Sequence, residues 1–277
     1  MDIDGTLLDS KSRLTDETRS AIADAAAAGI EIVIVTGRRF HSARATVDPL
    51  PCEFNVIATN GALVKSKEGE TLQRHLLPVT TARRVLQLTA EFRASAGVIF
   101  DRPREGQVVF EKIDWNGPYV GPYLSRHRDF VKEIVPLIDC LDTEDPLEVM
   151  YLGECAAIER AKNLLECSPF AGEFTLSYTA YEQRNLSMLD VLRKGVTKGV
   201  ALEDWARKRG IAREHVMAIG DNWNDREMLE FAGLPVVMDN SVPELKSLGW
   251  PVTLSNDSDG VAHAIRKYAL NGSGSGK

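Results

Sequence analysis

Acidic residues stand in short motifs near both ends of the chain. Asp2 and Asp4 belong to the motif DIDGT at residues 2–6, while Asp221 and Asp225 belong to GDNWND at residues 220–225. Several carboxylates without an accompanying histidine suit a hard cation with oxygen ligands, and Mg²⁺ fits because it keeps several waters and takes few protein groups. The residue types therefore predict a magnesium site, provided that the two ends of the chain fold together.

Such a site would let an acidic side chain approach a phosphate group. A phosphate monoester carries close to two negative charges at neutral pH, and a like-charge pair at ~4 Å near a protein surface costs about 4 kcal/mol. A metal ion and the ammonium of Lys198 would offset that repulsion, and Thr36 with nearby backbone amides could hold the phosphoryl oxygens. We therefore expect a small phosphorylated metabolite as the partner.

The elements between these motifs must bring them together. Apolar β-branched runs alternate with helical patterns toward both ends of the chain, which is typical of parallel strands joined by helical crossovers. Thr36 and Asp221 directly follow expected strands, at the sheet edge where open α/β folds place their ligands. The expected strands are 31–35, 56–58, 216–219 and 235–238, and the expected helices run from 15 to 29, through 43, and over 199–208, 226–231, 242–248 and 260–268.

The stretch from 79 to 189 has a different texture. Helices are expected at 85–92 and near 130–137, strands at 98–100 and 108–111, and a further pair of elements within 148–165. That is enough chain for an inserted α+β domain. We therefore predict a core made of residues 1–78 and 190–277 and an inserted domain at 79–189.

Composition excludes several classes of protein. With 277 residues, 44% of them hydrophobic, the chain is globular, and its net charge of -7 argues against nucleic-acid backbones and anionic membranes as partners. The four cysteines show neither a CxxC pair nor interleaved histidines, so neither a zinc site nor a disulfide framework is indicated. No apolar run approaches the ~20 residues of a membrane span, and we expect a cytoplasmic protein.

Taken together, the motifs resemble the haloacid dehalogenase superfamily and, within it, the Cof-type phosphatases. The matching segments are DIDGTLL at 2–8, VTGR at 35–38, TNGA at 59–62, KGVTKG at 194–199, GDNWND at 220–225 and VTLSNDSDGVAHAI at 252–265. Their order and spacing carry the resemblance, whereas TGR alone would mean nothing. The resemblance implies an α/β fold, a Rossmann-like doubly wound parallel-sheet core with an inserted α+β cap domain.

The resemblance also implies a role for each matched residue. Asp2 would be the nucleophile that forms an aspartyl-phosphate, and Asp4 would be the general acid and base. One oxygen of Asp2, the backbone carbonyl of Asp4 and the carboxylate of Asp221 would ligate Mg²⁺, with Asp225 acting through the waters of the metal. Lys198 would orient Asp2 and bind the phosphoryl group. The other expected substrate contacts are Thr36, Gly37, Arg38, Asn60, Gly61 and Asn224.

The implied function is that of a Mg²⁺-dependent phosphatase for small phosphate monoesters, such as sugar phosphates or phosphorylated cofactors, working as a monomer or homodimer. A phosphomutase or phosphotransferase could use the same intermediate, and a catalytically impaired binding protein is a third reading. Taken singly, the motifs have plainer interpretations. DxDGT could be a fragment of a calcium loop, GDNWND a polar helix cap, and Lys198 a solvated helix residue.

The start of the chain departs from the resemblance. Members of the family begin with a short hydrophobic strand that delivers the first aspartate to the sheet edge, whereas here only Met1 precedes Asp2. We expect the sheet to lack its central member and Asp2 to lie on a mobile terminus. A start site upstream of Met1 or a truncated chain would explain the departure, and a protein with impaired activity is the alternative.

Overall fold

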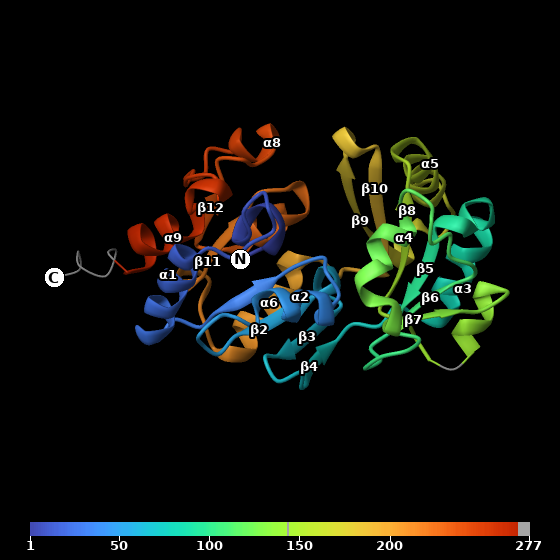
Figure 1. Cartoon of the computed structure of the whole chain (residues 1–277), viewed down its shortest axis with the longest axis horizontal. Helices are drawn as coiled ribbons and strands as arrows, with labels where there is room; N and C mark the ends of the chain where they lie inside the picture. Colours follow the sequence, from blue (N-terminus) through green and yellow to red (C-terminus); the bar gives the residue numbers. More distant parts are fainter. Residues whose placement is uncertain (143, 271–277) are drawn as a thin grey trace. The chain divides into compact units, whose positions relative to one another are not determined.

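The computed structural model describes residues 1–142 and 144–270 and divides them into two compact units (Figure 1). Met1–Gln73 and the described residues from Thr197 onward form the core unit, and Arg74–Val196 forms the inserted unit. The sequence placed the two junctions at 78/79 and 189/190. The second of these falls inside strand β10 (Leu186–Arg193), which belongs entirely to the inserted unit.

The strands of the core unit form two hydrogen-bonded groups. One contains β1 (Val33–Val35), β2 (Asn55–Ala58), β3 (Leu63–Ser66) and β4 (Thr71–Arg74), and the other contains β11 (Met217–Gly220) and β12 (Leu234–Val237). β1 pairs with β2 in parallel, and β11 pairs with β12 in parallel, as the alternating pattern predicted. β2 and β3 form an antiparallel hairpin around the turn at Thr59–Gly61.

Met1 and Asp2 lie between these two groups of strands. The amino group of Met1 donates to Val33 O at 2.9 Å, and the carbonyl of Met1 accepts from Val35 N at 2.8 Å. The amide of Asp2 donates to Ile219 O at 3.1 Å. The two residues are therefore held by β1 on one side and by β11 on the other, and the expected mobile terminus is wrong, because backbone hydrogen bonds fix Asp2 and only 5% of its surface is exposed.

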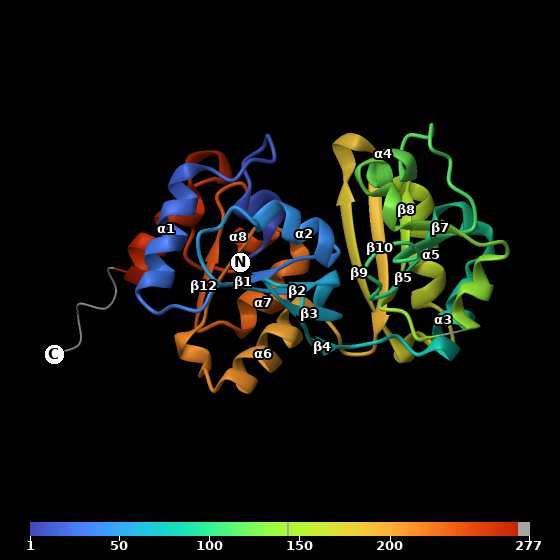
Figure 2. The same cartoon turned by 60° about the horizontal axis from the view of Figure 1, so that its bottom comes forward.

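Helices pack on these strands from two sides. The side chain of Thr15 accepts from Thr18 N and caps α1 (Asp16–Ala27), which packs against α9 (Gly260–Ala264). Thr197 caps α6 (Lys198–Arg209) in the same way, and α6 packs against α7 (Arg226–Phe231). Figure 2 shows α1 and α6 on opposite sides of the core strands. The remaining α-helices in the described part of this unit are α2 (Phe40–Val47) and α8 (Pro243–Lys246).

The inserted unit is a six-stranded sheet with helices packed against it. The strands follow the order β7-β6-β5-β8-β10-β9, and all neighbours are antiparallel except β6 and β7. α3 (Val79–Leu88) and α5 (Cys155–Glu166) contribute to one apolar cluster with alternate residues of the central strands. The other elements are α4 (Val120–Leu124), β5 (Ala96–Ile99), β6 (Val108–Phe110), β7 (Val131–Glu133), β8 (Glu148–Gly153) and β9 (Phe174–Tyr181).

One element of this unit was wrongly predicted. The segment near 130–137 was expected to be a helix, yet Val131–Glu133 is strand β7 and pairs with β6, with Val131 opposite Val108. Pro136 lacks the amide that a helix needs, so a helical run could not continue through it. No helix in the described ranges is long and apolar enough to cross a lipid bilayer.

Candidate active site

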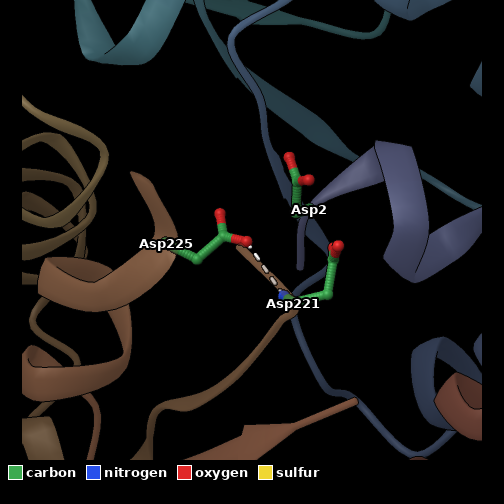
Figure 3. Close-up of side chains that lie close together, drawn as sticks. All are labelled: Asp2, Asp221 and Asp225. Carbon is green, nitrogen blue, oxygen red and sulfur yellow. Dashed lines mark hydrogen bonds between the residues drawn. The ribbon is translucent and has the colours of Figure 1, made fainter. Parts of the chain in front are cut away.

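Three aspartates from the two ends of the chain meet in the core unit. Asp2, Asp221 and Asp225 each offer a carboxylate oxygen, and these oxygens all lie within 4.8 Å of one another. Figure 3 shows the three side chains together, with the backbone amide of Asp221 donating to Asp225 Oδ2 at 3.0 Å. The fold thus brings position 2 next to position 221 at the carboxyl end of β11, where Asp2 N donates to Ile219 O. The motifs had predicted that these two positions share a site.

Lys198 neutralises part of this acidic cluster from the first turn of α6. Its Nζ donates to Asp2 Oδ1 at 2.9 Å and to Asp225 Oδ1 at 2.8 Å. The lysine side chain is 2% exposed and that of Asp225 is fully buried, so both ion pairs are shielded from water. A buried ammonium between two carboxylates excludes the plainer interpretation of Lys198 as a solvated helix residue.

Burial and mutual repulsion change the acidity of the site. Burial first, and then the charge of Asp225, raises the pKa of Asp2 to about 7, although Lys198 opposes the change. Burial and the neighbouring carboxylates of Asp2 and Asp225 raise the pKa of Asp221 to about 8. For Lys198, burial opposes the charged form, but Asp2 and Asp225 together outweigh it and raise its pKa. The carboxylates therefore crowd one another, which is the condition that a bound cation relieves.

Two tight loops hold the carboxylates in place. Gly5 has φ +80°, and a Cβ at that position would collide with the carboxylate of Asp221, so the DIDGT loop can pass this side chain only with glycine. Thr6 Oγ1 donates to Asp221 Oδ1 at 2.6 Å. In the GDNWND loop, the amides of Asp221 and Asn222 both donate to Asp225 Oδ2, at 3.0 and 3.1 Å.

Asp4 lies outside the carboxylate cluster. Its side chain is about half exposed, at 48%, and receives two hydrogen bonds from Arg38, from Nε at 2.7 Å and from Nη2 at 2.5 Å. Arg38 was expected to contact substrate, but in the structure its guanidinium contacts the predicted acid and base. The carboxylate of Asp4 therefore does not join Asp2 and Asp221, and a metal contact from this residue would use its backbone carbonyl, as the resemblance implied.

The remaining predicted substrate contacts line the loops after β1 and β2. Thr36 is buried, and its Oγ1 accepts from Arg38 N at 3.1 Å. Asn60 N donates to Thr36 O at 3.1 Å, and a Cβ at Gly37 would lie 3.0 Å from Asn60 Oδ1, so these two loops touch. Gly61 acts through packing, because a Cβ there would lie 2.5 Å from the carbonyl of Thr197, next to Lys198.

Two residues that received no individual role from the sequence support the site. Thr6 binds Asp221, and Asn240 Nδ2 donates to the carbonyl of Gly5 at 2.7 Å. Thr6 lies inside the DIDGT motif, and Asn240 lies shortly after the expected strand 235–238. Their positions in the sequence could therefore have indicated that they lie near the site. Asn224, predicted as a substrate contact, is half-buried on the short helix Trp223–Asp225 that carries Asp225.

A cavity of about 1120 Å³ in the core unit lies away from these residues. It is lined by Met1, by Val33 at the start of β1 and by Met217 at the start of β11, which are the amino ends of the strands. The carboxylate cluster stands at the opposite, carboxyl ends. We therefore place the chemistry at the cluster and not in this cavity.

The donor set fits Mg²⁺. The cluster offers only carboxylate oxygens, which are ligands for a hard cation, and no histidine or cysteine belongs to it. Burial first, and the neighbouring carboxylates second, raise the pKa of Asp2 and of Asp221, and a bound cation would favour their charged forms. Asp2, Asp221 and Asp225 are thus the side chains that could hold the ion.

Comparison with known families gives a match over nearly the whole chain. Residues 1–265 match the family described as haloacid dehalogenase-like hydrolase. A Streptococcus pyogenes relative, named provisionally as a phosphatase, is 34% identical, and the match covers 98% of this chain and 97% of that protein. The Bacillus subtilis phosphatase YwpJ is 28% identical over 96% of this chain and 97% of its own length. The B. subtilis 5-amino-6-(5-phospho-D-ribitylamino)uracil phosphatase YwtE is 27% identical, with 96% and 95% covered.

Solved structures with the same fold agree. A haloacid dehalogenase-like hydrolase from B. subtilis superposes with a TM-score of 0.80 at 26% identity and covers 97% of this chain and 98% of that one. A haloacid dehalogenase-like hydrolase from Bacteroides thetaiotaomicron gives a TM-score of 0.80 at 24% identity, with 96% and 97% covered. The predicted α/β core with an inserted α+β segment is therefore confirmed as the fold of this chain.

Proposed function

The chain is a phosphatase of the haloacid dehalogenase-like hydrolase family, and on that premise we propose that it hydrolyses small phosphate monoesters through an aspartyl-phosphate on Asp2. The observation that carries the proposal is the buried contact between Lys198 and Asp2, 2.9 Å long, beside the carboxylates of Asp221 and Asp225. One oxygen of Asp2 is fixed by the ammonium, which orients the other oxygen for attack on phosphorus.

In the first step, a carboxylate oxygen of Asp2 forms a bond to phosphorus while the bond from phosphorus to the ester oxygen breaks. Asp4 donates its proton to the leaving alcohol. Lys198 keeps Asp2 in position and offsets the charge of the phosphoryl group, and Thr36 with the amides of its loop holds the non-bridging oxygens. Asp2, Asp221 and Asp225, together with the backbone carbonyl of Asp4, would hold Mg²⁺, and the bound ion would supply positive charge that offsets the repulsion between the two anions.

In the second step, a water molecule attacks the phosphorus of the aspartyl-phosphate. Asp4, now a carboxylate, takes the proton from that water, and the bond between phosphorus and Asp2 breaks. Inorganic phosphate leaves, and both aspartates return to their starting states. One acid and base thus serves both halves of the reaction, which requires that the side chain of Asp4 stay within reach of the phosphoryl group.

The substrate class follows from the resemblance and the relatives. We propose sugar phosphates or phosphorylated cofactors, and the compound in the name of the YwtE relative, 5-amino-6-(5-phospho-D-ribitylamino)uracil, belongs in the first test panel. We assign the selection among them to the inserted unit, since the core loops described above supply groups for the phosphoryl end alone.

The test measures phosphate release from a panel of phosphorylated metabolites with Mg²⁺. We expect at least one good substrate, and acid quenching during turnover should trap a phosphoryl group on the peptide that contains Asp2, detectable by mass spectrometry. Asp2→Asn should abolish both turnover and trapping, because a neutral amide cannot attack phosphorus. Asp24→Asn, an exposed aspartate of α1, is the matched control and should behave as wild type.

Two results would contradict the proposal. Turnover by Asp2→Asn at the wild-type rate would remove Asp2 as the nucleophile. Exchange between hexose phosphate isomers without release of phosphate would instead assign the chain to the phosphomutases.

A further inference from the structure

Arg38 is anchored between Asp4 and helix α2. Its Nε donates to Asp4 Oδ2 at 2.7 Å and its Nη2 donates to Asp4 Oδ1 at 2.5 Å, which is the parallel two-bond arrangement that guanidinium and carboxylate groups favour. Its Nη1 donates to Thr46 Oγ1 at 2.8 Å, and that hydroxyl donates to Ser42 O at 3.1 Å. At least three of the five guanidinium N–H groups are therefore engaged in fixing one geometry.

The backbone of Arg38 is fixed as well. Its amide donates to Thr36 Oγ1 at 3.1 Å, and its carbonyl accepts from Thr59 N at 2.9 Å. The residue thus connects the loop after β1, the loop after β2 and the helix α2. Because both the backbone and the guanidinium of Arg38 are held, the position of the Asp4 carboxylate is fixed relative to these elements.

Asp4 is a group that needs such support. It lies in an irregular segment, with φ -81° and ψ 118° inside Ile3–Leu7, and its side chain is about half exposed. An exposed carboxylate on an irregular loop samples several rotamers, and holding one of them costs side-chain entropy. Asp2 does not share this problem, because Lys198 and burial fix its carboxylate.

We propose that Arg38 is a positioning residue that holds the carboxylate of Asp4 for proton transfer to and from the reacting oxygen. The inference rests on the proposed role of Asp4 as acid and base. It differs from the expectation drawn from sequence, in which Arg38 contacts the substrate itself. The two cations of the site then have separate tasks, since Lys198 serves the nucleophile and Arg38 serves the acid and base.

If Arg38 serves only the acid and base, substituting it should slow the reaction most for substrates whose leaving group depends most on proton donation. An alkyl phosphate releases a strongly basic alkoxide and depends on Asp4, whereas 4-nitrophenyl phosphate releases a stable phenolate. A residue that binds the phosphoryl group would affect both substrates, because both carry the same phosphoryl group.

The experiment is a double-mutant cycle of Arg38→Met and Asp4→Asn, measured with the best alkyl phosphate of the panel and with 4-nitrophenyl phosphate. General acid and base catalysis contributes roughly 10²–10⁴-fold. We therefore expect Arg38→Met to lower kcat for the alkyl phosphate about 10–100-fold, with KM changed less than about 3-fold. With 4-nitrophenyl phosphate, the rate constant of the pre-steady-state burst in Arg38→Met should differ from that of wild type by less than about 3-fold. When Arg38→Met is added to Asp4→Asn, kcat for the alkyl phosphate should fall by less than about a further 2-fold.

Three further variants keep the test independent of folding. Arg38→Lys retains the charge but not the two-bond geometry, so only partial recovery of the alkyl phosphate rate is expected. Thr46→Val removes the anchor on α2 and should lower the same rate a few-fold with the same substrate preference. Arg44→Met, a cation of α2 that contacts Asp48 and not Asp4, is the control and should leave both substrates unaffected.

The outcomes separate the two proposals. If Asp4→Asn turns over both substrates at the wild-type rate, the proposed acid and base role fails, and with it the premise of this inference. If Asp4→Asn is impaired but Arg38→Met raises KM for both substrates and costs as much in the Asp4→Asn background as in wild type, the positioning role alone fails and Arg38 is a phosphoryl ligand.

Discussion

Replacing Lys198 with methionine tests the arrangement on which the site is built. The substitution keeps much of the side-chain volume and removes the charge. It leaves the carboxylates of Asp2 and Asp225, which are 7% and 0% exposed, without their common cation. Because Asp225 also accepts two backbone amides, it cannot turn outward to reach water. We expect a large loss of stability in metal-free buffer.

The magnitude follows from the two contacts. At 2.9 and 2.8 Å, each ion pair is worth about 6 kcal/mol at an effective dielectric constant of about 20, before the cost of desolvation is subtracted. Removing one partner of a buried ion pair typically costs about 3–5 kcal/mol, because the other charge remains buried. For a chain of this length that corresponds to a fall of about 10 °C in Tm.

The sign of the pH dependence is fixed by the pKa of Lys198, which is raised above its ordinary value of 10.5. A group with a raised pKa in the folded state contributes fully below its unfolded pKa and loses its contribution only above that value. The stabilisation by Lys198 is therefore complete at pH 7.5. In Lys198→Met, acidification to about pH 5 should recover part of the lost stability, because the crowded carboxylates can then take up protons.

The assay is equilibrium unfolding followed by tryptophan fluorescence, which reports mainly on the core because Trp205, Trp223 and Trp250 lie there and only Trp115 lies in the inserted unit. Lys194→Met, an exposed lysine of the same KGVTKG segment, is the control. Asp225→Asn should lower the free energy of unfolding less in the Lys198→Met background than in wild type, since in that background it removes a buried carboxylate that has lost its cation. Equal unfolding midpoints for Lys198→Met and Lys194→Met would refute the reasoning.

Three other outcomes follow from the same site. Chelator-treated protein should lose phosphate release and regain it with Mg²⁺, and activity that survives chelation would exclude the metal. In metal-free buffer, the free energy of unfolding should fall as pH rises from about 4 to about 8, because burial raises the pKa of Asp2 to about 7 and that of Asp221 to about 8. The fall should reach at most about 1.4 kcal/mol per pH unit for each group. Denaturant titrations at several pH values should show a smaller fall for Asp221→Asn, and an unchanged fall would contradict the raised pKa of Asp221. Gly5→Ala should weaken Mg²⁺ binding at least about 10-fold and lower the free energy of unfolding by about 1–3 kcal/mol. Gly29→Ala is the control, because Gly29 has a similar φ of +83° but a Cβ there would meet no atom within 4 Å, so this variant should show only the cost of backbone strain. Equal Mg²⁺ affinity in these two variants would show that the contact between position 5 and Asp221 is unimportant.

The sequence by itself determined the elements and the chemical inventory of the core. Local signals sufficed for α1, where Thr15 caps the helix and Gly29 ends it, and for α7, whose bounds at 226–231 were predicted to the residue. They sufficed because capping bonds and apolar periodicity act over a few residues. The carboxylates at positions 2 and 221 were also identified from sequence, since the DIDGT and GDNWND motifs that contain them are short and required no distant contact.

Only the tertiary structure decided which of these groups touch. The carboxylate of Asp4 pairs with Arg38, 34 positions away, and Lys198 pairs with Asp225, 27 positions away, in addition to the expected contact with Asp2. No local pattern distinguishes the pairs of Arg38 with Asp4 and of Lys198 with Asp225 from other combinations of a cation and a carboxylate. The hydrogen bonds of Met1 to β1 and the strand at 131–133 likewise depend on neighbours supplied by the rest of the fold. Periodicity specifies which face of an element is buried, but the packing of whole elements specifies which charges meet, and here that packing sets the division of labour between two cations.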